Sequence, residues 1–103
     1  MNDRHAVTVQ ICNRKGLHAR ASAAFVRTVE QFDADIAVSF DGQTVGGGSI
    51  MALLTMAAGP GSEIEISATG PEAGDAIAAL KVLVETGFGE DTEGRCQPGK
   101  ATI

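Results

Sequence analysis

The chain has 103 residues, enough for one compact domain and too few for two. It is 44% hydrophobic with four Phe and no Trp or Tyr, so an aliphatic core with methionine is expected. A chain of this size leaves no room for a deep enclosed substrate cavity, and a net charge of −5 argues against general nucleic-acid binding. The N-terminal MNDRHAVTVQ is unlike a signal peptide and no apolar stretch is long enough to cross a bilayer, so a soluble cytoplasmic protein is expected.

Basic charge is concentrated near the N-terminus. From residue 4 to residue 27 there is no acidic residue, and the five basic residues are Arg4, Arg14, Lys15, Arg20 and Arg27. From residue 28 to the end there are twelve acidic residues and three basic ones. The N-terminal region therefore has the charge that attracts an anion or an acidic partner surface.

The first half of the chain predicts a strand, a helix and a hairpin. Apolar and polar residues alternate over 6–12, which predicts a half-buried strand that the NRKG segment ends. The alanine-rich stretch 19–32 has the apolar spacing of an amphipathic helix. Alternation returns over 35–40, and the Asp-Gly pair that follows predicts a tight hairpin with a short return strand at 43–46.

The second half predicts a helix, a strand and another helix. Ser49 is placed to cap an apolar helix over 50–58, which the GPG sequence stops. Residues 62–70 alternate again and predict a fourth strand. From Pro71, acidic residues in the first turn precede apolar residues at helical spacing, and Gly87 closes this helix.

The element order is therefore β-α-β-β-α-β-α, which indicates an α+β sandwich with helices on one face of the sheet. One domain is expected over 1–91, with 92–103 as a flexible tail because it lacks apolar periodicity. Cys12 and Cys96 lie far apart in the sequence, and each is interpreted as a buried or idle thiol rather than as half of a disulfide.

His18 stands where the first helix is expected to begin, after a tight turn that Gly16 permits. A helix start carries unpaired backbone N–H groups and a partial positive charge, so a phosphate on this ring would meet donors directly, with Arg20 as a further contact. From spacing alone, a helix cap or a surface residue is the commoner interpretation. His5, Cys12 and His18 have no ligand spacing, so neither a metal nor a cofactor is expected.

Two segments carry a family resemblance: GLHARAS with the alanine-rich helix after it, and GGGSIMALLTMAAGPGSEIEISATGPEAGDAIAAL. They resemble the histidine-containing phosphocarrier (HPr) family of the phosphoenolpyruvate-dependent phosphotransferase system, over about residues 5–91. The resemblance implies an HPr-like open-faced β-sandwich, with a four-stranded antiparallel sheet of order 1-4-2-3 and three helices on one face. It also implies a phosphocarrier without turnover of its own. Phosphorylated enzyme I would donate to Nδ1 of His18, Arg20 would hold the phosphate, and an EIIA-type protein would accept it.

One residue departs from the family pattern. Many members have proline where this chain has Ala21, but alanine is an excellent helix former, so function is expected to survive. The sequences FDADIAV and ATGPEAGDAIAALKVLVETGFGED resemble the nitrogen-related branch of the family. That likeness implies a regulatory phosphorelay more than bulk sugar uptake.

The second helix region carries two further expectations. The GGGS sequence lacks the lysine of a P-loop, so on its own Ser49 needs no role beyond the helix cap. The resemblance adds that Ser49 matches a serine that HPr kinase/phosphorylase modifies in some lineages. The following helix has more apolar residues than one buried face requires, and Ile50, Met51 and Leu54 match positions that dock partners in the family.

The expected partners are therefore enzyme I, EIIA-type proteins and, where the host has it, HPr kinase/phosphorylase. A monomer is expected, with no nucleic-acid partner and no membrane span. The alternative is a regulatory interaction domain that keeps the HPr fold and is controlled mainly through Ser49. The presence of His18 and Arg20 favours the carrier.

Overall fold

The computed structural model describes residues 4–12, 16–56 and 58–89. Four strands are formed: β1 (Arg4–Gln10), β2 (Asp35–Phe40), β3 (Gln43–Gly46) and β4 (Glu63–Thr69). The helices are α1 (Ala19–Val29), α2 (Ile50–Met56), α3 (Ala73–Glu85) and the 3₁₀ turn η1 (Gly87–Gly89). The predicted order β-α-β-β-α-β-α is confirmed, with η1 added after the last helix. The prediction of a flexible tail over 92–103 lies outside the described residues.

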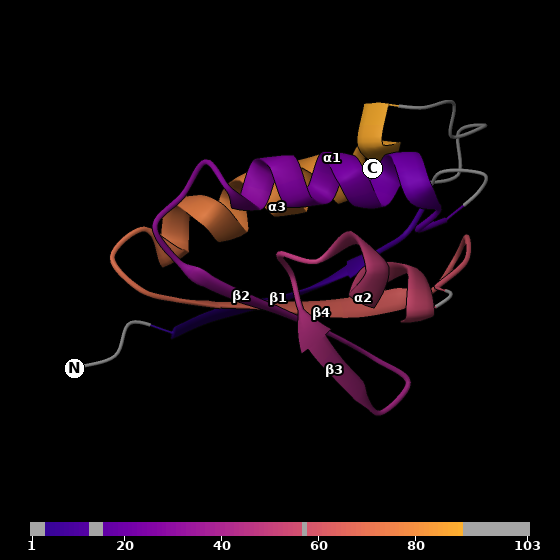
Figure 1. Cartoon of the computed structure of the whole chain (residues 1–103), viewed down its shortest axis with the longest axis horizontal. Coiled ribbons are helices and arrows are strands. Elements are labelled where there is room, and N and C mark those ends of the chain that lie inside the picture. The colour runs from indigo at the N-terminus through magenta and orange to yellow at the C-terminus, as the bar shows by residue number, and fades with distance from the viewer. Residues whose placement is uncertain (1–3, 13–15, 57, 90–103) are drawn as a thin grey trace, which may run out of the picture.

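The strands form one antiparallel sheet of order β1-β4-β2-β3. The long helices α1 and α3 lie side by side over one face of it, and α2 packs against α1 (Figure 1). The Asp-Gly pair at the β2–β3 hairpin takes the left-handed conformation, with φ of 52° at Asp41 and 82° at Gly42, as a tight two-residue hairpin turn requires. The α+β open-faced sandwich with sheet order 1-4-2-3 is therefore confirmed.

The core lies between the sheet and the helices and follows from the alternation of the strands. In β4, Ile64, Ile66 and Ala68 point inward and are buried, whereas the residues between them are exposed or half-buried. Phe25 of α1 is fully buried, and the other core side chains are almost all aliphatic. No helix in the described parts of the chain has both the length and the apolar character to cross a membrane.

Several element boundaries differ from the sequence prediction. Strand β1 starts two residues earlier than expected, because Arg4 and His5 pair with the end of β4. It also ends at Gln10, two residues early. The backbone N–H of Ile11 donates to the Ser62 carbonyl at 2.8 Å, and the carbonyl of Ile11 accepts from Gly61 N–H at 2.7 Å. These two bonds join the chain to the loop before β4, so the end of β1 and this loop are held together.

The helices are shorter than predicted. Helix α1 ends at Val29 because the next turn tightens, with Phe32 N–H donating to the Val29 carbonyl. Helix α3 begins at Ala73 rather than at Pro71. The Glu72 carboxylate does not cap its own helix; it accepts from Asp33 N–H at 2.6 Å and so ties the start of α3 to the segment before β2.

Candidate phosphorylation site at the start of helix α1

The backbone before α1 is held by a close approach to the loop after α2. Gly16 has a φ of +65°, and a Cβ at this position would lie 2.4 Å from the Ala58 carbonyl oxygen. The same oxygen accepts a hydrogen bond from Leu17 N–H at 3.0 Å. The sequence predicted the turn at Gly16 but not its contact with Ala58, which joins residues far apart in the chain and leaves no periodic signal.

His18 is the N-cap of α1, with an extended backbone (φ −85°, ψ −175°). Its side-chain Nδ1 accepts from the backbone N–H of Arg20 at 3.3 Å. A ring nitrogen that accepts must carry a lone pair, so in the neutral ring the proton lies on Nε2. The arrangement therefore leaves Nδ1 as the nucleophilic nitrogen and places it against the helix N-terminus.

The surroundings of Nδ1 suit an anion. The first turn of α1 contains no acidic residue, and its N–H groups carry the positive end of the helix dipole. His18 is half-buried, which limits its orientation, while Arg20 is exposed in the same turn. Ala21, in the same turn, is fully buried and packs into the core. Among the described residues, the site combines a nucleophilic nitrogen, backbone donors and the exposed cation of Arg20.

Ser49 is the cap of α2, as the sequence predicted. Its Oγ accepts from Ala52 N–H at 3.2 Å, and its carbonyl accepts from Leu53 N–H at 3.1 Å. The residue is exposed, so the hydroxyl that caps the helix is also reachable from solvent.

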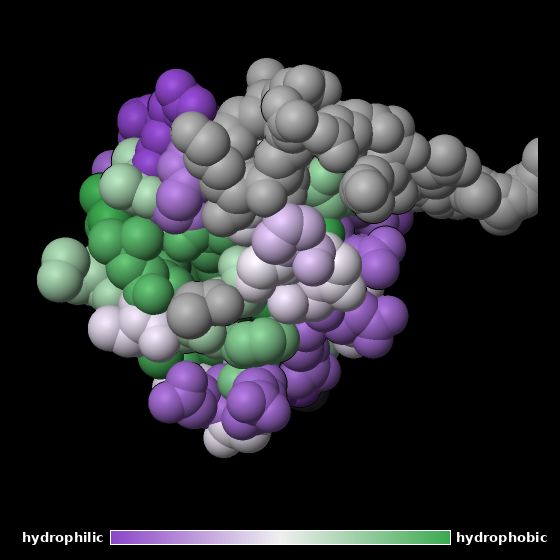
Figure 2. All heavy atoms as spheres, turned by 90° about the vertical axis from the view of Figure 1, so that its right-hand side faces the viewer, coloured by the Kyte–Doolittle hydropathy of each residue, from purple (hydrophilic) through white to green (hydrophobic). Residues whose placement is uncertain are grey.

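The apolar side chains of α2 divide into two groups. Leu53 and Met56 are buried in the core, with exposed fractions of 0% and 4%. Ile50 and Met51 are exposed by 37% and 70%, and Leu54 is half-buried. We call Ile50, Met51 and Leu54 the α2 patch. Figure 2 shows apolar surface gathered on the end of the molecule that includes the start of α1 and the loop after α2.

The two candidate phosphorylation positions relate to opposite ends of α2, the helix that carries the patch. The loop before His18 is bonded to Ala58, just beyond the C-terminal end of α2, whereas Ser49 is at the N-terminal end of the same helix. The two ends of a seven-residue helix are separated by about 10 Å. A phosphate on Ser49 would therefore lie at the opposite end of α2 from the residue that holds the backbone before His18.

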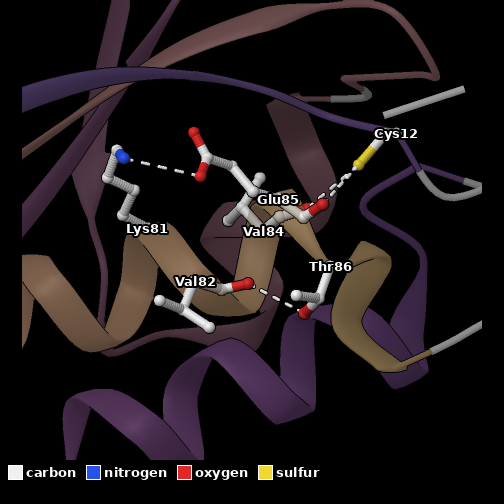
Figure 3. Close-up of polar contacts among 6 residues, drawn as sticks. All are labelled: Cys12, Lys81, Val82, Val84, Glu85 and Thr86. Carbon is white, nitrogen blue, oxygen red and sulfur yellow. Dashed lines mark hydrogen bonds and ion pairs between the residues drawn. The ribbon is translucent and has the colours of Figure 1, made fainter. Parts of the chain in front are cut away.

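The interpretation of Cys12 as an idle thiol is wrong. Cys12 is disulfide-bonded, and the described residues contain no free cysteine. Its Sγ lies 3.3 Å from the carbonyl oxygens of both Val84 and Glu85 at the end of α3, near the ion pair of Glu85 with Lys81 (Figure 3). A disulfide sulfur has no proton, so these are S···O contacts and not hydrogen bonds.

Comparison with known proteins places this geometry in a family. A family model described as the PTS HPr component phosphorylation site matches residues 6–86. The chain is 40% identical over 83 residues to the phosphocarrier protein HPr of Neisseria meningitidis, covering 81% of this chain and 93% of that protein. It is 38% identical over 85 residues to the phosphocarrier protein NPr of Escherichia coli, covering 82% and 94%.

A solved structure gives the same result. The crystal structure of HPr-C-His from Thermoanaerobacter tengcongensis superposes with a TM-score of 0.81 at 39% identity, covering 84% of this chain and 98% of that one. Fold and site together define a phosphocarrier, not an enzyme with independent turnover. The chain belongs to the HPr family of the phosphotransferase system, in which both HPr and NPr are relatives at about 40% identity.

Proposed function

We propose that His18 accepts a phosphoryl group from phosphorylated enzyme I and passes it to an EIIA-type protein. The observation that carries this proposal is Nδ1 of His18 at the start of α1, accepting from Arg20 N–H. In the transfer, the lone pair of Nδ1 forms a bond to phosphorus while the phosphorus–nitrogen bond of the donor breaks. The proton on Nε2 stays in place. The same steps run in reverse when the group moves on to the acceptor.

When His18 is phosphorylated, the backbone N–H of Arg20 changes its hydrogen-bond partner. In the free protein Arg20 N–H is bonded to Nδ1, and in the phosphorylated protein it is available to a phosphate oxygen. The dipole of an exposed helix start contributes about 0.3–1 kcal/mol to holding an anion. This is enough to orient a phosphoryl group without making it too stable to leave. The exposed guanidinium of Arg20 adds a charge-assisted contact that follows the phosphate during transfer.

The test is incubation with phosphoenolpyruvate and enzyme I, followed by intact mass measurement before and after acid treatment. One acid-labile phosphoryl group is expected on the wild type and on His5→Ala, and none on His18→Ala. The chain has two histidines, so His5→Ala is the matched control. Undiminished labelling of His18→Ala, or an acid-stable product, would overturn the proposal.

Arg20 is tested against another arginine of the same helix. Arg20→Ala is expected to slow transfer in both directions while changing the unfolding free energy by less than about 0.5 kcal/mol, because the side chain is exposed. Arg27→Ala, near the other end of α1, removes the same charge away from the site and should transfer normally. Equal rates for the two variants would show that Arg20 contributes only general charge.

Ser49 and the α2 patch supply the second part of the proposal. The exposed Ile50 and Met51, with the half-buried Leu54, form the surface that docks partners. Phosphorylation of Ser49 by an HPr kinase/phosphorylase, where present, regulates that docking. A phosphate would add about −1.5 to −2 charges beside the patch. The protein acts as a monomer in a nitrogen-related regulatory relay, a branch supported by its likeness to NPr.

Ser49→Asp separates folding from docking. Aspartate is a good N-cap and its charge suits a helix start, so the melting temperature should be unchanged or slightly higher. The same charge should slow phosphorylation of His18 by enzyme I, whereas Ser49→Asn, a neutral cap of similar size, should not. A normally folded Ser49→Asp variant that is phosphorylated at the wild-type rate would refute regulation through charge.

A further inference from the structure

A buried hydroxyl lies one turn of α1 beyond His18. Ser22 has an exposed fraction of 0%, and among the residues that the structure describes it is the one polar residue that is buried. A buried hydroxyl costs free energy unless it is hydrogen-bonded, and an apolar side chain of similar size avoids this cost. Neither the cap of α1 nor the α2 patch uses this hydroxyl. What it does must therefore follow from the group to which it is bonded.

Ser22 is bonded to both of the peptide units that flank His18. Its Oγ donates to the Leu17 carbonyl at 3.5 Å, and its backbone N–H donates to the His18 carbonyl at 2.8 Å. The first carbonyl belongs to the peptide unit before Cα of His18, and the second belongs to the unit after it. Because peptide units are planar, the φ of −85° and the ψ of −175° at His18 are fixed by the orientations of these two units. Ser22 therefore contacts both groups that set the backbone of His18.

Only one of these two bonds depends on the serine side chain. The bond to the His18 carbonyl is the first of the helix, and any residue other than proline could donate it from this position. The Leu17 carbonyl lies before the cap, where the helix supplies no N–H group, and the donor that reaches it is the Ser22 hydroxyl. Leu17 is itself buried, with an exposed fraction of 4%, so water is not a ready substitute. The hydroxyl therefore supplies a donor that the helix backbone does not.

We propose that the Ser22 hydroxyl positions His18 for phosphoryl transfer by holding the Leu17 carbonyl. The role in transfer rests on the proposed function of His18. The Leu17–His18 peptide unit is bonded at both ends, since the N–H of His18 donates to the Gly16 carbonyl at 2.9 Å. A fixed unit fixes the direction in which Cβ of His18 leaves the backbone, and with it the starting point of the ring. Nδ1 is thereby kept beside the first-turn N–H groups, 3.3 Å from the backbone nitrogen of Arg20.

Without the hydroxyl, the peptide unit before His18 is less firmly held. A buried carbonyl that loses its donor favours rotation of its peptide unit toward another donor. Rotation of the Leu17–His18 unit changes φ of His18 and moves the ring relative to α1. Nδ1 must approach phosphorus while the first-turn N–H groups meet the phosphate oxygens, and such reactions are sensitive to displacements of about 1 Å. Ser22 is fully buried, so it acts through His18 and touches neither the phosphoryl group nor enzyme I.

The first test compares Ser22→Ala with Thr28→Val by nitrogen–proton NMR of the unphosphorylated protein. Thr28 is a matched control because its Oγ1 donates to the Ala24 carbonyl at 3.1 Å, further along the same helix. In Ser22→Ala, the Nδ1 signal of His18 should move toward that of a ring nitrogen without a hydrogen bond, and the Arg20 amide proton should exchange faster with water. Thr28→Val should show neither change. Unchanged signals and exchange in Ser22→Ala would overturn the positioning role.

The second test measures phosphorylation with phosphoenolpyruvate over a range of enzyme I concentrations. The maximal rate of Ser22→Ala should fall by at least about twofold, the lower end of what one hydrogen bond contributes, while the half-saturating concentration of enzyme I stays the same. Thr28→Val should match the wild type, and circular dichroism should show both variants folded.

Three results of this second test would overturn the proposal: an unchanged maximal rate, an effect on the half-saturating concentration alone, or unfolding of Ser22→Ala. A wild type that is not phosphorylated would instead overturn the proposed function. The NMR comparison needs no enzyme I, so it would still decide whether Ser22 holds His18 in place.

Discussion

Gly16→Ala is predicted to destabilise the protein because Gly16 meets two separate constraints. Its φ of +65° costs an L-residue about 1–2 kcal/mol. A Cβ there would also lie 2.4 Å from the Ala58 carbonyl oxygen and 2.7 Å from Cα of Gly59, both backbone atoms that cannot rotate away. Overpacking of this kind costs about 1–3 kcal/mol. The expected loss in the free energy of unfolding is therefore about 2–5 kcal/mol. This is a large share of the total, because a small domain typically has an unfolding free energy of about 5–15 kcal/mol.

Gly42→Ala provides the control for the conformational part. Gly42 also has a positive φ, +82°, but no atom lies within 4 Å of where its Cβ would be. It should lose about 1–2 kcal/mol and keep normal phosphorylation of His18. Urea unfolding of both variants gives the difference, and the rate of phosphorylation by enzyme I shows whether the loop before α1 has moved. If Gly16→Ala is no less stable than Gly42→Ala, the close approach to Ala58 is wrong.

Four further substitutions separate packing from surface roles in urea unfolding. Leu53→Ala should lower the free energy of unfolding by about 2–5 kcal/mol because the side chain is fully buried. Met51→Ala should change it by no more than about 0.5 kcal/mol. Similar losses in the two variants would contradict the division of α2 into core and patch. Ser49→Ala should cost about 0.5–2 kcal/mol through loss of the cap, and an unchanged midpoint would remove that role. Gly47→Ala should cost about 1–3 kcal/mol because its Cβ would lie 2.6 Å from Cγ2 of Ile36, and no loss would show that Ile36 moves aside.

Local patterns determine most of the fold, which is why the sequence predicted it well. Alternation identified β4 because the two faces of this strand meet different environments, core on one side and solvent on the other. The Asp-Gly turn fixed the bounds of β2 and β3 as predicted, at 35–40 and 43–46. Ser49 was predicted as a cap because its hydroxyl needs only the backbone three residues ahead.

The structure differs from the sequence prediction where contacts between residues far apart in the chain determine the local conformation. The start of α3 is displaced because Glu72 bonds to Asp33 N–H instead of capping its own helix. Phe88 lies in the left-handed region at φ 58° yet is buried, a conformation that local propensity disfavours for an aromatic residue. The oxidised state of Cys12 is likewise a property that spacing along the chain cannot indicate.

For the candidate site, too, the sequence predicted some features and missed others. The position of His18 at a helix start and the residue types around it could be predicted because these residues are consecutive in the sequence. The choice of Nδ1 came from the family resemblance and not from the residue pattern, because it depends on the rotamer that brings this nitrogen to Arg20 N–H. Nor could spacing show which apolar residues of α2 face solvent, since that is set by how the helix packs on α1.

The central claim is that Nδ1 of His18 is the atom that takes the phosphoryl group. Long-range nitrogen–proton NMR of the ring, recorded before and after phosphorylation by enzyme I and phosphoenolpyruvate, tests it most directly. Before phosphorylation, we predict Nε2 to carry the proton and Nδ1 to accept from Arg20 N–H. Afterwards, phosphorus coupling should appear on Nδ1 and the proton should remain on Nε2. Phosphorus on Nε2, or on the ring of His5, would contradict this account.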